Sequence, residues 1–120
     1  MSKYLPTNIE LRKKSRLLVV TFEEGEIFEL SCEFLRVFSP SADVKGHSPN
    51  QAVLQIGKED ATITAVEPIG NYAVRLVFKD GHDTGLYTWD YLYDLGSRME
   101  IYWSNYLSAL EVAGHERKTE

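Results

Sequence analysis

Apolar and polar residues alternate over much of the first third of the chain, as they do in strands with one buried face. The segments RLLVVTF (16–22) and IFEL (27–30) predict two strands joined at Glu24-Gly25, a two-residue turn in which glycine accepts a positive φ. The residues expected to meet on the buried face are Leu18, Val20, Phe22, Phe28 and Leu30.

A short helix is expected next. Ser31 is a suitable N-cap for CEFLRVFS (32–39), and Pro40 follows as a stop. The apolar stripe of this helix consists of Phe34, Leu35 and Phe38.

The following segment, 39–60, has the least regular pattern, with two of the four prolines and two of the eight glycines. It predicts a long surface loop with at most one short turn or strand. Loops of this length within a compact domain are uncommon and are often functional or mobile.

Regular alternation returns at Ala61, with a strand ending at Pro68 and a turn at Gly70-Asn71. The next strand, 72–78, leads to a second two-residue turn at Asp80-Gly81. Its predicted buried face consists of Tyr72, Val74, Leu76 and Phe78. The return strand, HDTGLY, carries Gly85, which indicates a bulge or a close approach of another part of the backbone.

Two helices are predicted in the last third. Thr88 caps the first helix, WDYLYDL, and Gly96 lies beyond its end. Ser97 to Glu100 match a capping box, so a second helix starts afresh there and stops near Gly114. Its expected apolar stripe is Trp103, Tyr106, Leu107 and Leu110.

The chain also contains an internal echo. Residues 20–30 align without a gap on residues 76–86, sharing the phenylalanine, the acidic-Gly turn and the final leucine. The match is either a repeated strand-turn-strand-helix unit or a coincidence between common hairpins. The expected fold is α+β, a single compact domain of mainly antiparallel β-hairpins with two or three short helices. The predicted limits are a flexible N-terminus (1–6), the domain (7–113) and a frayed C-terminal tail (114–120).

The composition of the chain argues against several classes of partner and of covalent structure. The chain has 120 residues, 13 Lys and Arg against 18 Asp and Glu, and a net charge of −5, which argues against nucleic acid or an anionic membrane as partner. The basic run 11–16 is expected to be a solvated edge. Cys32 is the only cysteine, so no disulfide within the chain is possible. No signal peptide or membrane span is recognised, and the expected location is the cytoplasm.

Few residues suggest chemistry. His82 follows the turn glycine and lies beside two aspartates, so it is either a metal ligand or acid/base group, or a polar residue flanking a turn. His47 is a loop histidine with no partner deducible from spacing. Cys32, His47 and His82 would together suit zinc, but no short ligand spacing supports such a site. The sequence has neither a phosphate-binding loop nor a nucleophile elbow.

Aromatic residues crowd the region from Trp89 to Tyr106. Most are expected in the core, but two short helices cannot turn all of them inward. One or two exposed aromatic rings near a loop would anchor a partner.

Two stretches carry a family resemblance. FLRVFSPSADVKGH (34–47) and DGHDTGLYTWDYLYDLG (80–96) closely resemble the N-terminal domain of gamma-butyrobetaine hydroxylase, which in bacteria also occurs alone as a small family of uncharacterised function. The resemblance covers roughly residues 7–110.

In the hydroxylase this domain binds a structural zinc through three cysteines and the histidine of an Asp-Gly-His turn. The resemblance places His82 on that histidine, whereas Ser39 and Ser41 stand where thiolates would be expected. It therefore implies that the zinc site is absent. The hydroxylase's oxidation, which depends on iron and 2-oxoglutarate, belongs to a C-terminal catalytic domain, and no H-x-D pattern occurs here, so no enzymatic activity is expected. Related domains fused to P-loop ATPases resembling iron–sulfur cluster carriers suggest a role in metal handling.

The main hypothesis is thus a non-enzymatic module that binds an unidentified protein partner. Its predicted interaction surface consists of Arg36, Ser39, Ser41, His47, Asp80, His82 and Trp89. The alternative is an accessory protein that binds iron or zinc weakly, with His82 and His47 as candidate ligands. An enzyme acting on a carnitine-like substrate is a third possibility, resting on the family name alone. The oligomeric state is left open.

Overall fold

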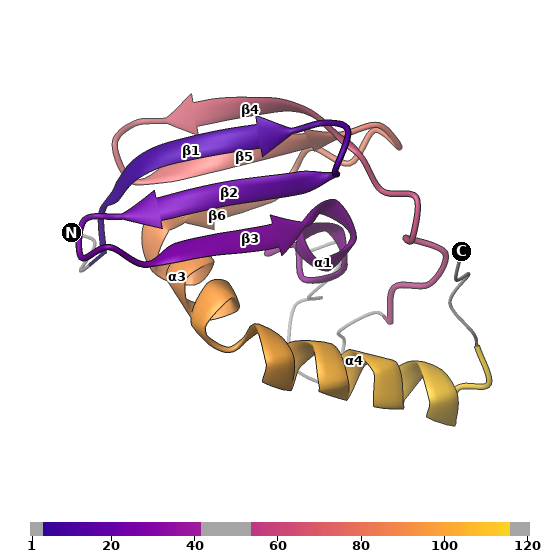
Figure 1. The fold of residues 1–120 in the computed structure, drawn as a ribbon. Coiled ribbons are helices and arrows are strands. Elements are labelled where there is room, and N and C mark those ends of the chain that lie inside the picture. The colour runs from indigo at the N-terminus through magenta and orange to yellow at the C-terminus, as the bar shows by residue number, and fades with distance from the viewer. Residues whose placement is uncertain (1–3, 42–53, 116–120) are drawn as a thin grey trace.

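Two three-stranded antiparallel sheets form the framework of the protein (Figure 1). The computed structural model describes residues 4–41 and 54–115. The first sheet, in the order β1-β2-β3, consists of β1 (Pro6–Arg12), β2 (Leu17–Phe22) and β3 (Ile27–Ser31). The second, in the order β4-β5-β6, consists of β4 (Ile63–Ile69), β5 (Ala73–Phe78) and β6 (Leu86–Thr88). The helices within the described residues are α1 (Cys32–Val37), α3 (Trp89–Ser97) and α4 (Met99–Val112). The α+β prediction is confirmed.

The two predicted hairpins form and have the same turn geometry, but each loop encloses three residues, 23–25 and 79–81, and not the predicted two. In the β2–β3 turn, the Gly25 N–H donates to the Phe22 carbonyl at 3.0 Å, and the Phe22 N–H donates to the Glu26 carbonyl at 2.9 Å. In the β5–β6 turn, the Gly81 N–H donates to Phe78 and the Phe78 N–H to His82, both at 2.9 Å. Both glycines have positive φ, +100° and +92°. The sequence echo therefore corresponds to two equivalent hairpins, each followed by a helix.

Strand β1 was not among the predicted strands. It pairs with β2 along nearly its whole length, from Pro6 opposite Phe22 to Arg12 opposite Leu17. Only Ile9 and Leu11 of this edge strand pack on the core, with the exposed Glu10 between them. Two half-buried residues are a weak pattern, so the pairing with β2 decides the conformation.

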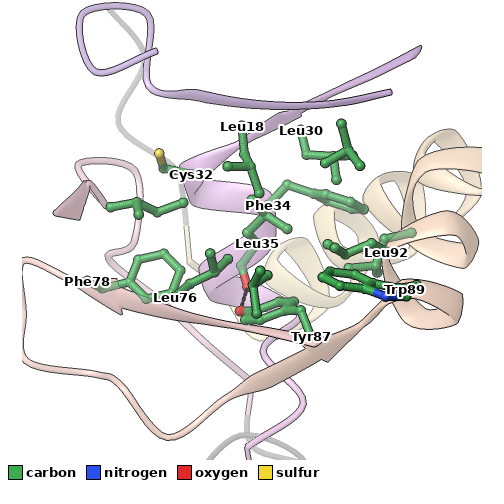
Figure 2. Close-up of a cluster of buried hydrophobic side chains, with 14 of the residues drawn as sticks. Leu18, Leu30, Cys32, Phe34, Leu35, Leu76, Phe78, Tyr87, Trp89 and Leu92 are labelled. Atoms are coloured by element: carbon green, nitrogen blue, oxygen red, sulfur yellow. Dashed lines mark hydrogen bonds between the residues drawn. The ribbon is translucent and has the colours of Figure 1, made fainter. Parts of the chain in front are cut away.

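Helix α1 lies between the sheets, with α3 beside it (Figure 2). All six of its residues are buried, which includes the charged side chains Glu33 and Arg36. The Ser31 Oγ accepts a hydrogen bond from the Phe34 N–H at 3.0 Å, so the predicted N-cap is confirmed. Cys32 is 1% exposed, and burial raises the pKa of its thiol. The fully buried side chains around α1 include Leu18, Val20, Leu30, Leu76, Phe78, Tyr87 and Leu92.

Several details at the helix ends differ from the predictions. Gly96 lies within α3, not beyond it, and a Cβ there would come within 2.4 Å of the Phe28 Cγ, so this position requires glycine for close packing and not as a helix stop. The Ser97 hydroxyl donates to the Asp94 carbonyl instead of capping α4, whose N-cap is Arg98 without a side-chain hydrogen bond. The helix does start afresh at Met99 and ends at Val112, before Gly114, which has a φ of +78°.

Two residues predicted on buried faces are exposed: Tyr72, at the β4–β5 turn, and Leu107, on α4. At the N-terminal end, Tyr4 stacks on Tyr93 of α3 with the ring centroids 3.7 Å apart. The predicted domain limits stay a prediction. None of the helices in the described parts of the chain is long and apolar enough to cross a membrane.

Candidate functional site

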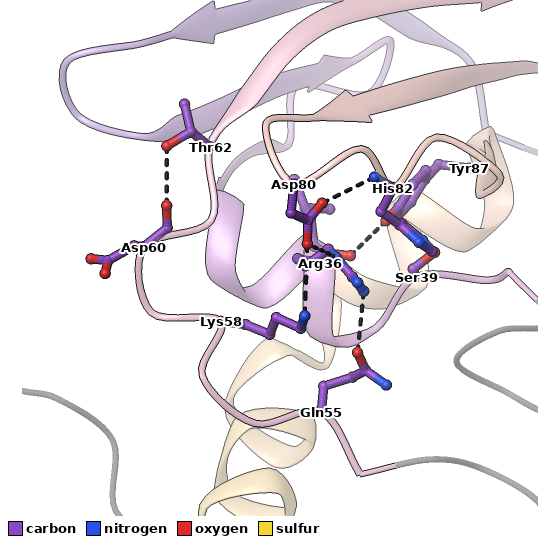
Figure 3. A network of polar contacts seen from close by, with 10 residues as sticks. Arg36, Ser39, Gln55, Lys58, Asp60, Thr62, Asp80, His82 and Tyr87 are labelled. Atoms are coloured by element: carbon purple, nitrogen blue, oxygen red, sulfur yellow. Dashed lines mark hydrogen bonds and ion pairs between the residues drawn. The ribbon is translucent and has the colours of Figure 1, made fainter.

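Residues 34–41 of the first segment that carried the family resemblance meet the second segment in space (Figure 3). The end of α1 and the residues after it contact the β5–β6 turn through a group of polar side chains. This polar cluster consists of Arg36, Ser39, Ser41, Asp80, His82 and Thr84. More than forty residues of sequence separate its two halves, as between Arg36 and Asp80.

An ion pair between Arg36 and Asp80 is the first set of contacts in the polar cluster. The Arg36 Nε lies 3.0 Å from the Asp80 Oδ2, and the Arg36 Nη1 donates to the Gln55 Oε1 at 3.2 Å. The Arg36 side chain is 9% exposed and that of Asp80 is 41% exposed. The Lys58 Nζ approaches the same Asp80 oxygen at 3.7 Å. A nearly buried guanidinium requires such partners, because its charge would otherwise be desolvated without compensation.

The carboxyl group of Asp80 is also held by the backbone of its own turn. The Asp80 Oδ1 accepts from the His82 N–H at 3.0 Å. Burial by itself raises the pKa of Asp80, but this hydrogen bond and the charges of Arg36 and Lys58 outweigh it and lower the pKa from 3.8. Asp80 therefore stays ionised and fixes the turn to α1.

A chain of hydrogen bonds through serine and threonine hydroxyl groups is the second set of contacts in the polar cluster. The Ser39 Oγ lies 2.8 Å from the His82 Nε2 and accepts the Ser41 N–H at 3.2 Å. The Ser41 Oγ lies 2.6 Å from the Thr84 Oγ1. Ser39 and Ser41 are 0% and 6% exposed, so these hydrogen bonds are largely shielded from water. The start of the predicted surface loop is thus buried, which corrects the expectation for this part of residues 39–60.

Gly85 lets the two segments come this close. A Cβ at this position would lie 2.5 Å from the Ser39 Oγ and 3.2 Å from the Pro40 Cδ. Of the two alternatives predicted for Gly85, a bulge or a close backbone approach, the structure shows a close approach, and the approaching atoms belong to the side chains of Ser39 and Pro40. Strand β6 is correspondingly short, since it begins only at Leu86.

Two tyrosines secure the carbonyl groups of this segment. The Tyr87 hydroxyl donates to the Leu35 carbonyl and the Tyr91 hydroxyl to the Phe38 carbonyl, both at 2.5 Å. Burial raises the pKa of both phenols, so they stay protonated and act as donors. The last carbonyls of a helix lack partners within it, and these hydroxyls supply them. Sequence reasoning missed this role, because it counted Tyr91 among aromatic residues expected mostly in the core and assigned nothing to Tyr87.

The serine and histidine do not form an accessible catalytic pair. Their 2.8 Å distance is the one expected between a nucleophile and its base. However, Ser39 is fully buried, and Asp80 binds the backbone N–H of His82 and the Arg36 side chain. The cluster therefore joins two segments, and a substrate would reach the hydroxyl only if they separated.

The side chains around His82 also determine whether this region could bind a metal ion. Within residues 4–41 and 54–115, no group of three or more His, Cys, Asp or Glu side chains is placed to hold a metal ion. Ser39 and Ser41, at the positions where the resemblance implied thiolates, contact His82 and Thr84 through hydroxyl groups. Neutral hydroxyl groups are poor ligands for zinc. His47 lies outside the described residues.

Beside the polar cluster is a hollow of about 350 Å³. Its lining residues come from the segment before β4, from the end of β5 and from the β5–β6 turn: Gly57, Lys58, Asp60, Ala61, Thr62, Phe78, Lys79 and Asp80. Ile56 and Leu54, just before it in sequence, are 45% and 37% exposed. Sequence reasoning had treated this stretch only as loop.

The predicted interaction residues thus have different positions. Arg36, Ser39 and Ser41 are buried. Trp89 is only 8% exposed and its Nε1 donates to the Asn71 carbonyl at 2.7 Å, so it packs in the core and offers little surface. Of the seven residues, Asp80 is exposed and His82 is half-buried.

Comparison with known proteins identifies the family. Residues 9–93 match the family model described as gamma-butyrobetaine hydroxylase-like, N-terminal. The chain belongs to this family. The predicted resemblance is therefore confirmed, and the matched region extends from β1 into α3. No curated protein matches the chain.

Solved structures agree with the assignment to the gamma-butyrobetaine hydroxylase-like N-terminal family. Two proteins with NMR solution structures are 50% and 45% identical to this chain, with TM-scores of 0.82 and 0.85. The matches cover 97% and 99% of this chain and 86% and 94% of the relatives. A crystal structure from Acidithiobacillus ferrooxidans, of a DUF971 family protein of unknown function, is 36% identical with a TM-score of 0.62, covering 76% of this chain and 91% of that one.

Proposed function

We propose that this family member is a non-enzymatic protein-interaction module. Its contact surface would be the turn surface, defined as Leu54 to Lys58 together with the β5–β6 turn from Lys79 to His82. The observation that carries the proposal is the polar cluster, which holds this turn against α1 through the ion pair of the buried Arg36 with Asp80 and through the hydroxyl groups of the buried Ser39 and Ser41. Rigid support of an exposed turn is what a binding surface requires, because it reduces the entropy lost on association.

The composition of the turn surface supports a contact with protein. Ile56 and Leu54 are exposed aliphatic side chains beside a hollow with a phenylalanine in its lining. Lys79 and Asp80 supply exposed charged groups around the same hollow. Protein interfaces combine apolar contacts at the centre with a polar rim in this manner.

The buried members of the cluster support the surface from beneath. Substitution of Arg36, Ser39 or Trp89 would change folding and contact at the same time, so a test should use exposed positions. A photoreactive amino acid at Ile56 or at Lys79, introduced in the cell that produces the protein, should give a discrete crosslinked product with a partner.

The matched control is Ile27, which is 63% exposed and lies in the β2–β3 turn region, at the opposite end of the sheets (Figure 1). A photoreactive group there should give no such product. Crosslinking that is absent at both Ile56 and Lys79, or equal at all three positions, would contradict the proposal.

Weak binding of iron or zinc stays the second proposal, and it rests on His82, which lies beside two aspartates in the β5–β6 turn region. The chain purified without a histidine tag should then bind Zn²⁺ or Fe²⁺ at equivalent amounts, with selective shifts of the His82 and His47 ring resonances. A titration with Zn²⁺ and Fe²⁺ that shifts the resonances of neither histidine ring would refute the metal-binding proposal.

A further inference from the structure

Charge is distributed unequally between the two ends of the sheets. The β1–β2 turn and the turn surface lie at one end (Figure 1), and the basic residues there are Lys13, Lys14, Arg16, Lys58 and Lys79. The β2–β3 turn and the start of α3 lie at the other, with Glu23, Glu24, Glu26 and Asp90. The carboxylates of Glu59, Asp60 and Asp80 belong to the same segments, and the five cations outnumber them, so a chain with a net charge of −5 has an excess of positive charge at this end. The contact between the Arg16 Nη1 and the Asp60 Oδ1, at 3.6 Å, connects the β1–β2 turn to the hollow.

Three of these cations are available to a ligand. Lys13, Lys14 and Lys79 are exposed, and none of them makes an ion pair with another of the described residues. Arg16 and Lys58 each approach one carboxylate, Asp60 and Asp80. Unpaired lysines on two neighbouring turns attract an anionic partner and raise its rate of association.

The hollow, which has Lys58 and Lys79 in its lining, adds an apolar component. Phe78 and Ala61 are among its lining residues, and Ile56 is exposed beside it. We infer that the basic end binds a segment of another protein in which acidic residues flank one or more large apolar side chains. The apolar side chain enters the hollow, and the carboxylates face Lys14 and Lys79. This inference rests on the proposed interaction function and names the chemistry of its partner.

Two other occupants fit less well. The carboxylates of Asp60 and Asp80 interrupt the basic residues at the hollow, and a phosphate backbone, with a charge on every nucleotide, would meet them. A peptide can place an uncharged apolar side chain there and keep its carboxylates near the lysines. A second copy could offer its acidic end to the basic end of the first. Such a head-to-tail contact does not close, and it would extend into open chains.

The first experiment is a selection of random 12-residue peptides displayed on phage against the full chain. The enriched peptides should combine Asp or Glu with Leu, Ile or Phe. Their affinity, measured by fluorescence anisotropy with the synthetic peptides, should fall on raising the salt concentration. Lys79→Gln and Lys14→Gln should each weaken binding about 3- to 10-fold. The matched control Arg98→Gln removes the same charge at the α3–α4 junction and should leave the affinity unchanged.

Enrichment of basic or uncharged peptides, or no enrichment, would overturn the inference. It would also be overturned if single-stranded RNA bound in a Lys79-dependent way while the acidic peptides did not. Sedimentation that reveals self-association, abolished by Lys79→Gln, would assign the basic end to a second copy instead.

The photocrosslinking experiment separates this inference from the proposed function. A discrete product at Lys79 with a partner that lacks an acidic segment would leave the proposed function standing and refute the acidic ligand. Absence of any product at Ile56 and Lys79 would refute the proposed function itself.

Discussion

Replacing Ser39 by alanine is expected to destabilise the protein strongly for so small a change. The Ser39 Oγ accepts the buried Ser41 N–H and contacts the His82 Nε2, and Ser39 itself is 0% exposed. A buried N–H that loses its acceptor costs about 1–3 kcal/mol. His82 is half-buried, so water replaces part of its lost contact, and the cost there is below about 1 kcal/mol. The free energy of unfolding should therefore fall by about 1–4 kcal/mol.

The assay is unfolding in urea, followed by tryptophan fluorescence and by circular dichroism, with the slope m compared between variants. The matched control is Ser97→Ala, which removes an exposed hydroxyl that donates to the Asp94 carbonyl at 3.3 Å. It should change stability by less than about 0.5 kcal/mol. A loss for Ser39→Ala that is no larger than that of Ser97→Ala would refute the claim that the hydroxyl joins the two segments.

Three further substitutions or reagents test other parts of the structure. Gly96→Ala should destabilise the fold by about 1–3 kcal/mol in the same urea assay, because its Cβ would meet the Phe28 ring at 2.4 Å; stabilisation, as alanine gives elsewhere in a helix, would contradict this. The pKa of Asp80 is lowered on folding, so its contribution to stability is present above about pH 3.8 and is lost as the pH falls through the lower folded value. In the Asp80→Asn variant, the urea concentration at the unfolding midpoint should therefore fall less steeply as the pH is lowered. A fall as steep as in the natural chain would count against the Arg36 ion pair. Cys32 should react with a thiol reagent only at the rate of unfolding, since it is 1% exposed and burial raises its pKa; fast reaction in native buffer would show that α1 opens.

The hairpins and the helix starts could be predicted because their signals are local. Glycine after an acidic residue marked both turns, and a hydroxyl at Ser31 and Thr88 marked two helix N-termini. Gly85 was also interpreted correctly, since a glycine within a strand pattern indicates a close approach whatever the neighbour is. The neighbour itself, Ser39, could not be inferred from the residues around Gly85.

The errors have a common physical origin, which is packing between distant segments. Gly96 looked like a helix stop because nothing near it in sequence shows that the Phe28 ring lies against it. Arg36 looked like a surface residue, yet Asp80, 44 positions away, makes its burial tolerable. Strand β1 has too few apolar residues to be recognised from its own sequence, and it forms because its backbone pairs with β2.

At the candidate site, too, local sequence features were predictable and contacts between distant segments were not. The residues of the two family motifs were identified from the sequence, but their burial was not, so the supporting residues were assigned to the surface. The lining of the hollow between Gly57 and Asp80 was missed, because its residues carry no motif and come together only when β4 pairs with β5.

The most direct test of the account asks whether the polar cluster supports the binding surface. A photoreactive group at Lys79 is compared in the otherwise natural chain and in the Ser39→Ala and Ser97→Ala backgrounds, at a temperature where all three are folded. The account predicts a discrete crosslinked product in the natural chain and with Ser97→Ala, and a several-fold smaller yield with Ser39→Ala. An equal yield in all three would contradict it, because the turn would then bind its partner without the buried hydrogen bonds beneath it.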